Sequence, residues 1–184
     1  MAEKKGITLI EVVITIAVVI ILFIILSPLI SSNIEHARVA RAAADVDRIG
    51  KAILKFRYDV GQWPISNYSG NPNPKQNLLF GDGKRLWDKQ DKKHLKYFLK
   101  DNSGNFPTPK KGKAKGKPVW RGPYLYRFNP DPFGNAYLVN SQYFDVAKRR
   151  VWILSPGKNQ SIEASFDGSK ALPSESDDIV FRLQ

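Results

Sequence analysis

The chain has 184 residues, a formal net charge of +12 and no cysteine. This length has room for one long helical segment and one globular domain, but not for two such domains. The absence of cysteine excludes disulfide bonds, thiolate nucleophiles and cysteine-ligated metal sites, and it leaves the redox compartment open.

A nearly uninterrupted apolar run extends from residue 7 to residue 30, directly after two lysines and a glycine. It meets the length of ~20 residues that a helix needs to cross a bilayer core about 30 Å thick. Lys4 and Lys5 precede the run, so we expect the N-terminus to stay in the cytoplasm and the rest of the chain to lie across the membrane. Pro28 falls inside the run and should interrupt the helix, because its nitrogen has no proton to donate.

Glu11 is the one carboxylate of this apolar run. A charged side chain in hydrocarbon is unfavourable by about 3 kcal/mol, unless it snorkels to the membrane surface or meets a cation. Cleavage of the chain between Gly6 and Ile7 would create an α-amine four residues before Glu11, on the same face of the helix. The spacing therefore predicts either a snorkelling carboxylate or an ion pair with that amine, within one subunit or between neighbours.

Residues 31–61 are expected to form an amphipathic stem helix. Apolar side chains recur along it at steps of three and four: Val39, Ala42, Val46, Ile49, Ile53, Phe56 and Val60. Gly61 and Pro64 follow, as is typical of a helix end. We expect this face to pack on the chain's own sheet, and a coiled-coil dimer is the alternative.

Residues 62–184 are expected to form a globular domain. Residues 66–83 are rich in Asn, Pro, Gly and Ser, which predicts a loop, and residues 86–99 could hold a short helix. Three short β-branched or aromatic runs predict strands, at residues 137–139, 150–154 and 179–183. The expected fold is α+β, with a long N-terminal helix packed on a small C-terminal antiparallel sheet.

A basic insertion, residues 84–117, contains twelve Lys and Arg against three Asp and so carries most of the net charge. Five of its lysines alternate with Gly, Pro and Ala: Lys110, Lys111, Lys113, Lys115 and Lys117. This composition predicts a solvated loop over residues 101–118. The alternative is charge neutralisation of nucleic acid, anionic polysaccharide or acidic lipid headgroups, with Phe106 and Trp120 as stacking rings.

The sequence contains few features that indicate an enzyme. The sequence contains no nucleophile-elbow, zinc-protease, P-loop or dinucleotide-binding motif. Its two histidines, His36 and His94, are expected to be surface residues. We therefore predict a protein that is not an enzyme.

The segment KGITLIE, residues 5–11, resembles the cleavage signal of type IV pilins and pseudopilins. In that family a membrane peptidase cuts after the glycine and the new N-terminus is methylated, which implies processing at Gly6 and Ile7. Glu11 is then the fifth mature residue and Pro28 the twenty-second, positions at which the family carries glutamate and proline. The resemblance implies that residues 1–6 are a leader peptide and that Glu11 and Pro28 serve assembly of a filament.

Four further motifs resemble those of the major pseudopilin of type II secretion systems: GPYL at 122–125, DPFGNAY at 131–137, SPG at 155–157 and DDI at 177–179. The resemblance covers the N-terminal helix and the last third of the chain, but not residues 66–117. It implies a pilin-like fold, an inner-membrane precursor with a periplasmic domain, and a pseudopilus that supports protein export. The implied partners are further copies of the chain, other pseudopilins, the prepilin peptidase and an inner-membrane assembly platform.

Three alternatives stay open on the sequence. The chain could be a type IV or competence pilin that binds DNA through its Lys-rich insertion. It could instead be a membrane-anchored domain that never polymerises, or a minor subunit at the tip of a filament.

In that major pseudopilin, the loop after the Ser-x-Gly element binds calcium. The resemblance implies Asn159, Asp177 and Asp178 as calcium ligands here, although the family usually has aspartate at the position of Asn159. Calcium takes about six to eight oxygen ligands, so Glu163, Asp167 or Glu175 could complete the set: all three lie in the same loop. The alternative is that the two aspartates are ordinary turn residues.

Overall fold

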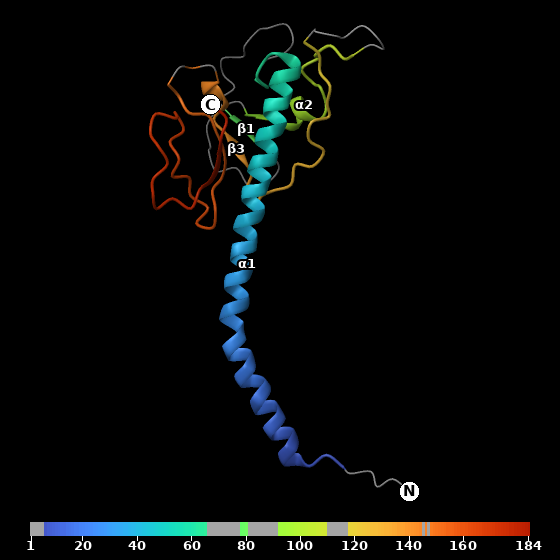
Figure 1. Cartoon of the computed structure of the whole chain (residues 1–184), viewed down its shortest axis with the longest axis vertical. Helices are drawn as coiled ribbons and strands as arrows, with labels where there is room; N and C mark the ends of the chain where they lie inside the picture. Colours follow the sequence, from blue (N-terminus) through green and yellow to red (C-terminus); the bar gives the residue numbers. More distant parts are fainter. Residues whose placement is uncertain (1–5, 66–77, 81–91, 110–117, 145, 147) are drawn as a thin grey trace. The chain divides into compact units, whose positions relative to one another are not determined.

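The computed structural model describes residues 6–65, 78–80, 92–109, 118–144, 146 and 148–184. The chain divides into two compact units, Met1–Arg38 and Val39–Gln184. Helix α1, Leu9–Val60, contributes to both units and is the long helix labelled in Figure 1. A long N-terminal helix followed by a small sheet gives the α+β layout that the sequence predicts.

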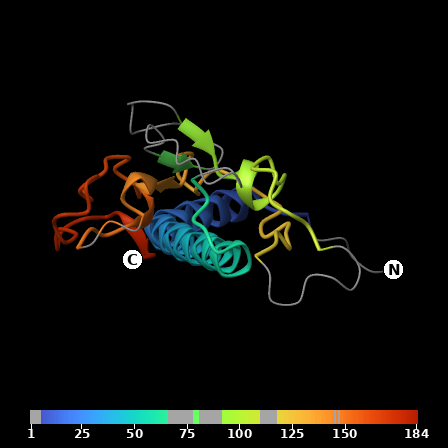
Figure 2. The ribbon, with the colours of Figure 1, turned by 90° about the horizontal axis from the view of Figure 1, so that it is seen from above.

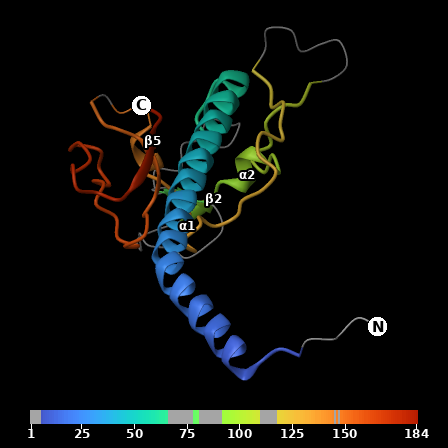
Figure 3. The ribbon, with the colours of Figure 1, turned by 60° about the horizontal axis from the view of Figure 1, so that its bottom comes forward.

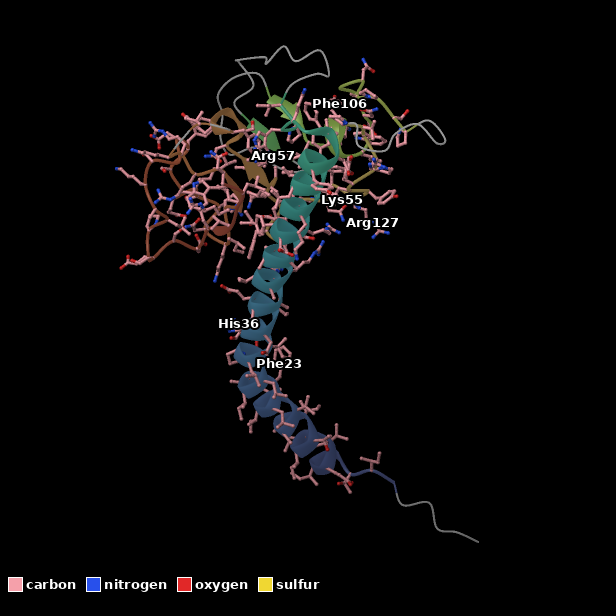
Figure 4. All side chains as sticks on the ribbon, turned by 45° about the horizontal axis from the view of Figure 1, so that its top comes forward. Phe23, His36, Lys55, Arg57, Phe106 and Arg127 are labelled. Atoms are coloured by element: carbon pink, nitrogen blue, oxygen red, sulfur yellow. The ribbon has the colours of Figure 1, made fainter. Side chains whose placement is uncertain are left out.

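The described part of the first unit is dominated by the apolar half of α1, and its side chains are exposed. Leu9 is 84% exposed, and Phe23, labelled in Figure 4, is 72% exposed. By length and composition α1 can cross a membrane, and none of its most apolar window is buried. The helix continues without a break through Pro28, so the predicted interruption was wrong. A proline removes one hydrogen bond, and the neighbouring turns of this 52-residue helix keep theirs.

The second half of α1 carries the main packing face of the second unit. Six of the seven side chains predicted for this face are buried: Ala42, Val46, Ile49, Ile53, Phe56 and Val60. Val39 is 42% exposed, so its assignment to the face was wrong, and it lies at the very start of this unit. At the other end Gly61 has a φ of 75° and donates its N–H to the Arg57 carbonyl at 2.8 Å. This left-handed conformation ends the helix and suits glycine.

The sheet of the second unit has five strands in the order β2-β1-β3-β4-β5. Their bounds are β1 Leu78–Phe80, β2 Lys92–His94, β3 Leu138–Val139, β4 Trp152–Ser155 and β5 Ile179–Arg182. Strands β3, β4 and β5 pair antiparallel, which confirms the three predicted strands within two residues at each end. Strand β1 adds antiparallel to β3, and β2 adds parallel to β1.

The middle of the chain contains two strands that were not predicted. Strand β1 lies within residues 66–83, whose prediction as a loop was therefore wrong. The short helix expected within residues 86–99 is confirmed as α2, Lys96–Leu99, and strand β2 precedes it in the same range. Pairing with a neighbouring strand orders such short segments, because strand formation depends more on cross-strand neighbours than on local composition. A 3-10 helix, η1, Ser141–Tyr143, follows β3.

The described start of residues 101–118 differs from the predicted solvated loop. Phe106 is 2% exposed, and its ring lies edge to face with that of Phe56 at a centroid distance of 5.3 Å. Trp120 donates its Nε1–H to the Phe98 carbonyl at 2.9 Å. Phe106 is therefore a core residue and is not available to stack on a base. The free energy gained by burying its aromatic ring is larger than the preference of the polar neighbouring residues for solvent. The five lysines of the predicted polyanion contact lie outside the described residues.

Two segments of the second unit flank the second half of α1. In Figures 1, 2 and 3 the C-terminal segment from residue 157 onward (orange to red) lies on one side of the helix, and residues 118–128 (yellow) lie on the other. Contacts agree with this view on the yellow side, where Arg121 pairs with Asp59. On the red side, the ring of Phe181 lies directly against the backbone of α1 at Gly50.

Candidate functional site

The first turn of α1 holds Glu11, one of the two assembly residues that the sequence predicts, and the other, Pro28, lies in the interior of the helix. Thr8 precedes the helix, and its Oγ1 and its carbonyl accept hydrogen bonds from the Glu11 N–H at 3.4 and 3.2 Å. Thr-x-x-Glu is the pattern of a capping box, and a carboxylate in the first turn also favours the helix dipole. Sequence reasoning missed the helix cap formed by Thr8, although the spacing of Thr8 and Glu11 is the signal for it.

Gly6 and Ile7 lie just before the helix and are both exposed, Ile7 by 76%. A Cβ added at Gly6 would meet no atom within 4 Å. Packing within the described chain therefore gives no reason for glycine at this position. A requirement for glycine would have to come from a partner that binds this segment.

The predicted calcium residues come together in the C-terminal loop. Asp177 Oδ2 accepts the Asn159 N–H at 2.9 Å, and the Asn159 amide donates to Glu163 Oε1 at 2.7 Å. Asp178 Oδ2 accepts the N–H groups of Glu163 and Ala164 at 2.9 and 2.7 Å. Asn159, Asp177 and Asp178 are thus linked into one network, and Glu163 belongs to it as well.

Two carboxylate oxygens of this network have no hydrogen-bond partner. Asp177 Oδ1 and Asp178 Oδ1 are both buried and unpaired within the described part of the chain. Burial raises the pKa of Asp178 to about 6, and the neighbouring carboxylates of Glu163 and Asp177 add to the rise, although two backbone N–H groups oppose it. An unpaired buried carboxylate oxygen is unfavourable, and a cation would satisfy it.

The other candidate ligands of the loop lie apart from this network. Asp167 accepts hydrogen bonds from Ser169 and from Arg149, the latter at 2.8 Å, and these contacts hold its pKa at about 2. Glu175 is exposed. Among the described residues no group of three or more His, Cys, Asp or Glu converges closely enough to hold a metal ion. A calcium ion here would therefore depend on backbone carbonyls as well as on the two aspartates.

Two of the motifs that carry the resemblance meet beneath this loop. Asp131 Oδ1 accepts the N–H groups of Phe133 and Asn135 at 3.0 and 2.6 Å. Asp131 Oδ2 accepts the hydroxyl of Ser155 at 2.6 Å, and that hydroxyl oxygen accepts the Gly157 N–H at 3.3 Å. This buried chain of hydrogen bonds fixes the end of β4, from which the loop begins.

Glycine is required at position 157 for two reasons. Its φ is 66°, and a Cβ there would collide with the carbonyl oxygen of Asp177. The chain at Gly157 therefore passes directly beside Asp177, which sets the position of the acidic pair. The sequence identified the SPG motif, but it gave no sign of this close approach.

Comparison of the chain with family models, with curated proteins and with solved structures finds no match.

Proposed function

We propose that this chain is a structural subunit of a type II secretion pseudopilus, made as an inner-membrane precursor. The observation that carries the proposal is the division of α1 into two halves of opposite character. The first half is apolar and exposed, while the second half buries one face in a core of its own unit. The chain therefore combines a globular unit that buries its own core with a long apolar helix surface whose exposure to water is unfavourable.

A membrane supplies that environment before assembly, and other copies of the chain supply it afterwards. Burial of apolar surface is favourable by about 25 cal/mol for each Å² removed from water. A bundle of such stems can therefore replace the lipid contacts while it keeps the apolar side chains out of water. In this proposal the prepilin peptidase cuts between Gly6 and Ile7, and an inner-membrane platform then extracts the subunit. The Ile7 amine of one subunit pairs with Glu11 of a neighbour and sets the axial register.

We further propose calcium as a structural ion of the C-terminal loop. Support comes from the two unpaired oxygens of Asp177 and Asp178 and from their link to Asn159. These residues supply the hard oxygen ligands that calcium prefers, and carbonyls of residues 155–158 would supply others. The ion would neutralise the buried carboxylates and hold the loop against β5.

The test is the mass and assembly of the full chain expressed with a prepilin peptidase. We expect the intact mass to show loss of Met1–Gly6, and thiol crosslinking of single cysteines placed in the apolar half to give oligomers. A Gly6→Val variant is the control, because a bulkier residue at the cut should leave the full-length mass and prevent crosslinking. If the mature chain retains its first six residues, the filament proposal is wrong and the protein is a membrane-anchored domain that does not polymerise.

A further inference from the structure

Two cations on the outer face of the second unit have no partner among the described residues. Lys55 and Arg127 are exposed, and the structure gives them no ion pair or side-chain hydrogen bond. Their neighbours differ, since Lys51 pairs with Asp47 at 2.7 Å and Arg121 pairs with Asp59 at 3.5 Å. We call Lys55, Arg127 and the exposed rings of Tyr58 and Tyr126 the cationic face, in which the rings are 89% and 70% exposed.

The core contacts explain why the cationic face lies on one side of α1. The ring of Tyr124 meets that of Phe56 at 5.6 Å, and Leu125 and Phe128 are buried in the same core. The segment that carries Tyr126 and Arg127 is therefore held along the last turns of the helix. Figure 4 shows Lys55 and Arg127 on the side of α1 away from the C-terminal segment.

The C-terminal segment presents one exposed and unpaired carboxylate. Residues 173–176 form a turn in which Ser176 donates its N–H to the Pro173 carbonyl at 3.2 Å. The Ser176 hydroxyl anchors this turn, because it donates to Glu163 at 3.3 Å and accepts the Asp178 N–H at 3.1 Å. Glu175 lies at the tip of the turn, exposed and without a partner among the described residues.

We propose that the Glu175 turn of one copy docks on the cationic face of a second copy of this chain. The C-terminal segment, which carries the Glu175 turn, and residues 118–128, which carry Arg127, lie on opposite sides of α1 in Figures 1, 2 and 3, so a contact between them would join two molecules. A contact between two different patches repeats from copy to copy and produces an open polymer, unless the rotation between copies closes it into a ring. The inference rests on the proposed function and names the surfaces by which neighbouring globular units recognise one another.

Charge complementarity supports a second copy of this chain as the occupant of the cationic face. The cationic face has two unpaired cations, and the Glu175 turn has a carboxylate held on an anchored backbone. Exposed ion pairs contribute little to affinity, so the contact would orient neighbours while the apolar stems hold them together. Such a contact weakens as salt concentration rises.

Crosslinking of the full chain tests the contact directly, because the natural chain has no cysteine. Arg127→Cys and Glu175→Cys combined should give a ladder of oligomers with a short thiol crosslinker, whereas either substitution alone should give no ladder. Lys170→Cys with Arg127→Cys is the matched control, since Lys170 is exposed in the same loop. No ladder from the first pair, together with intact crosslinking through the apolar stems, overturns the contact and leaves the proposed function standing. Loss of both kinds of crosslink removes the proposed function as well.

Charge reversal provides the second readout. Lys55→Glu and Glu175→Lys should each lower the yield of stem-crosslinked polymer about fivefold, the upper range for a surface ion pair, and the double variant should recover it. If Lys55→Glu leaves the polymer unchanged but abolishes salt-sensitive retention of the full chain on an alginate column, the face binds acidic polysaccharide. That result overturns docking of a second copy.

Discussion

At the scale of single residues, Tyr137 joins the sheet to α1. Its hydroxyl donates to Asp45 Oδ2 at 3.0 Å, and Asp45 also pairs with Arg48 at 2.9 Å. Burial raises the pKa of Tyr137 well above its usual value, and the Asp45 carboxylate adds to the rise. Ionisation of this hydroxyl would place two negative charges side by side, so the folded state keeps it protonated.

We predict that Tyr137→Phe lowers the free energy of unfolding by about 1–2 kcal/mol at neutral pH, because Asp45 loses a buried donor. A folded pKa above the unfolded value of ~10 gives stability that is complete below pH 10 and is lost as pH rises further. The wild-type chain should therefore lose stability above pH 10 more steeply than the variant. Urea unfolding of the full chain in detergent, followed by tryptophan fluorescence, measures both effects.

Tyr126→Phe is the matched control for that measurement. Tyr126 is 70% exposed, and its loss of a hydroxyl should leave the unfolding free energy unchanged within error. Equal stability of the Tyr137→Phe variant and the wild type would show that the contact with Asp45 contributes nothing net.

The two unpaired aspartate oxygens lead to a second prediction at this scale. Calcium at about 10 to 100 times its dissociation constant should stabilise the full chain by about 1.4–2.7 kcal/mol, because it binds the folded loop alone. Asp177→Asn should remove the response, whereas Asp167→Asn should keep it, since Asp167 pairs with Arg149 instead. Thermal unfolding with calcium and with a chelator measures the response. An unchanged melting temperature of the wild type rejects the calcium site.

At the scale of elements, the contact between α1 and β5 depends on Gly50. A Cβ added at Gly50 would lie 2.5 Å from two ring atoms of Phe181. Alanine in a helix interior is favoured over glycine by about 1 kcal/mol, so propensity alone would predict a more stable variant. Overpacking costs about 1–3 kcal/mol, and we expect this clash to be the larger effect.

Gly50→Ala should therefore destabilise the second unit, and Gly50→Ala combined with Phe181→Leu should recover part of the loss. Urea unfolding of the full chain and of the three variants completes a double-mutant cycle. A positive coupling between the two sites supports direct packing. If Gly50→Ala alone raises stability, the ring of Phe181 moves aside easily and the contact is loose.

Some elements could be predicted from the sequence because their signal is long. Spacing at three and four residues over several turns identified six of the buried side chains of α1. The three residues of β1 are too few to carry a periodic signal, and their order comes from pairing with β3. Phe106 escaped prediction for a related reason, since its neighbours are polar and its partner Phe56 lies fifty positions earlier in the sequence.

The candidate site could likewise be predicted only in part from the sequence. Motifs at 131–137, 155–157 and 177–179 were identified separately, and the fold joins them through Asp131, Ser155 and Gly157. The proximity of Glu163 to Asn159 and the two unpaired oxygens could not be predicted, because they depend on how the loop folds back. A sequence gives the residues of such a site more readily than their hydrogen bonds.

At the scale of the whole molecule, the apolar half of α1 is exposed, and the function of the chain depends on what covers this half. Glu11 lies in the first turn of that half, where it completes the Thr-x-x-Glu pattern that begins at Thr8 and also supplies a carboxylate. Capping tolerates glutamine at this position, whereas pairing with an amine requires a carboxylate. Two substitutions therefore distinguish the roles.

Glu11→Val removes the polar group and the charge, and Glu11→Gln removes the charge alone. We expect both variants to insert into the membrane and to lose the leader, since neither shortens the apolar run. Both should fail to form stem-crosslinked polymer, because the Ile7 amine of a neighbour would be left in apolar surroundings without a carboxylate. Membrane fractionation, intact mass and crosslinking of the full chain measure the three steps. Normal polymer from Glu11→Gln would show that the residue acts through the helix cap, and the pairing of Glu11 with a neighbouring amine would be wrong.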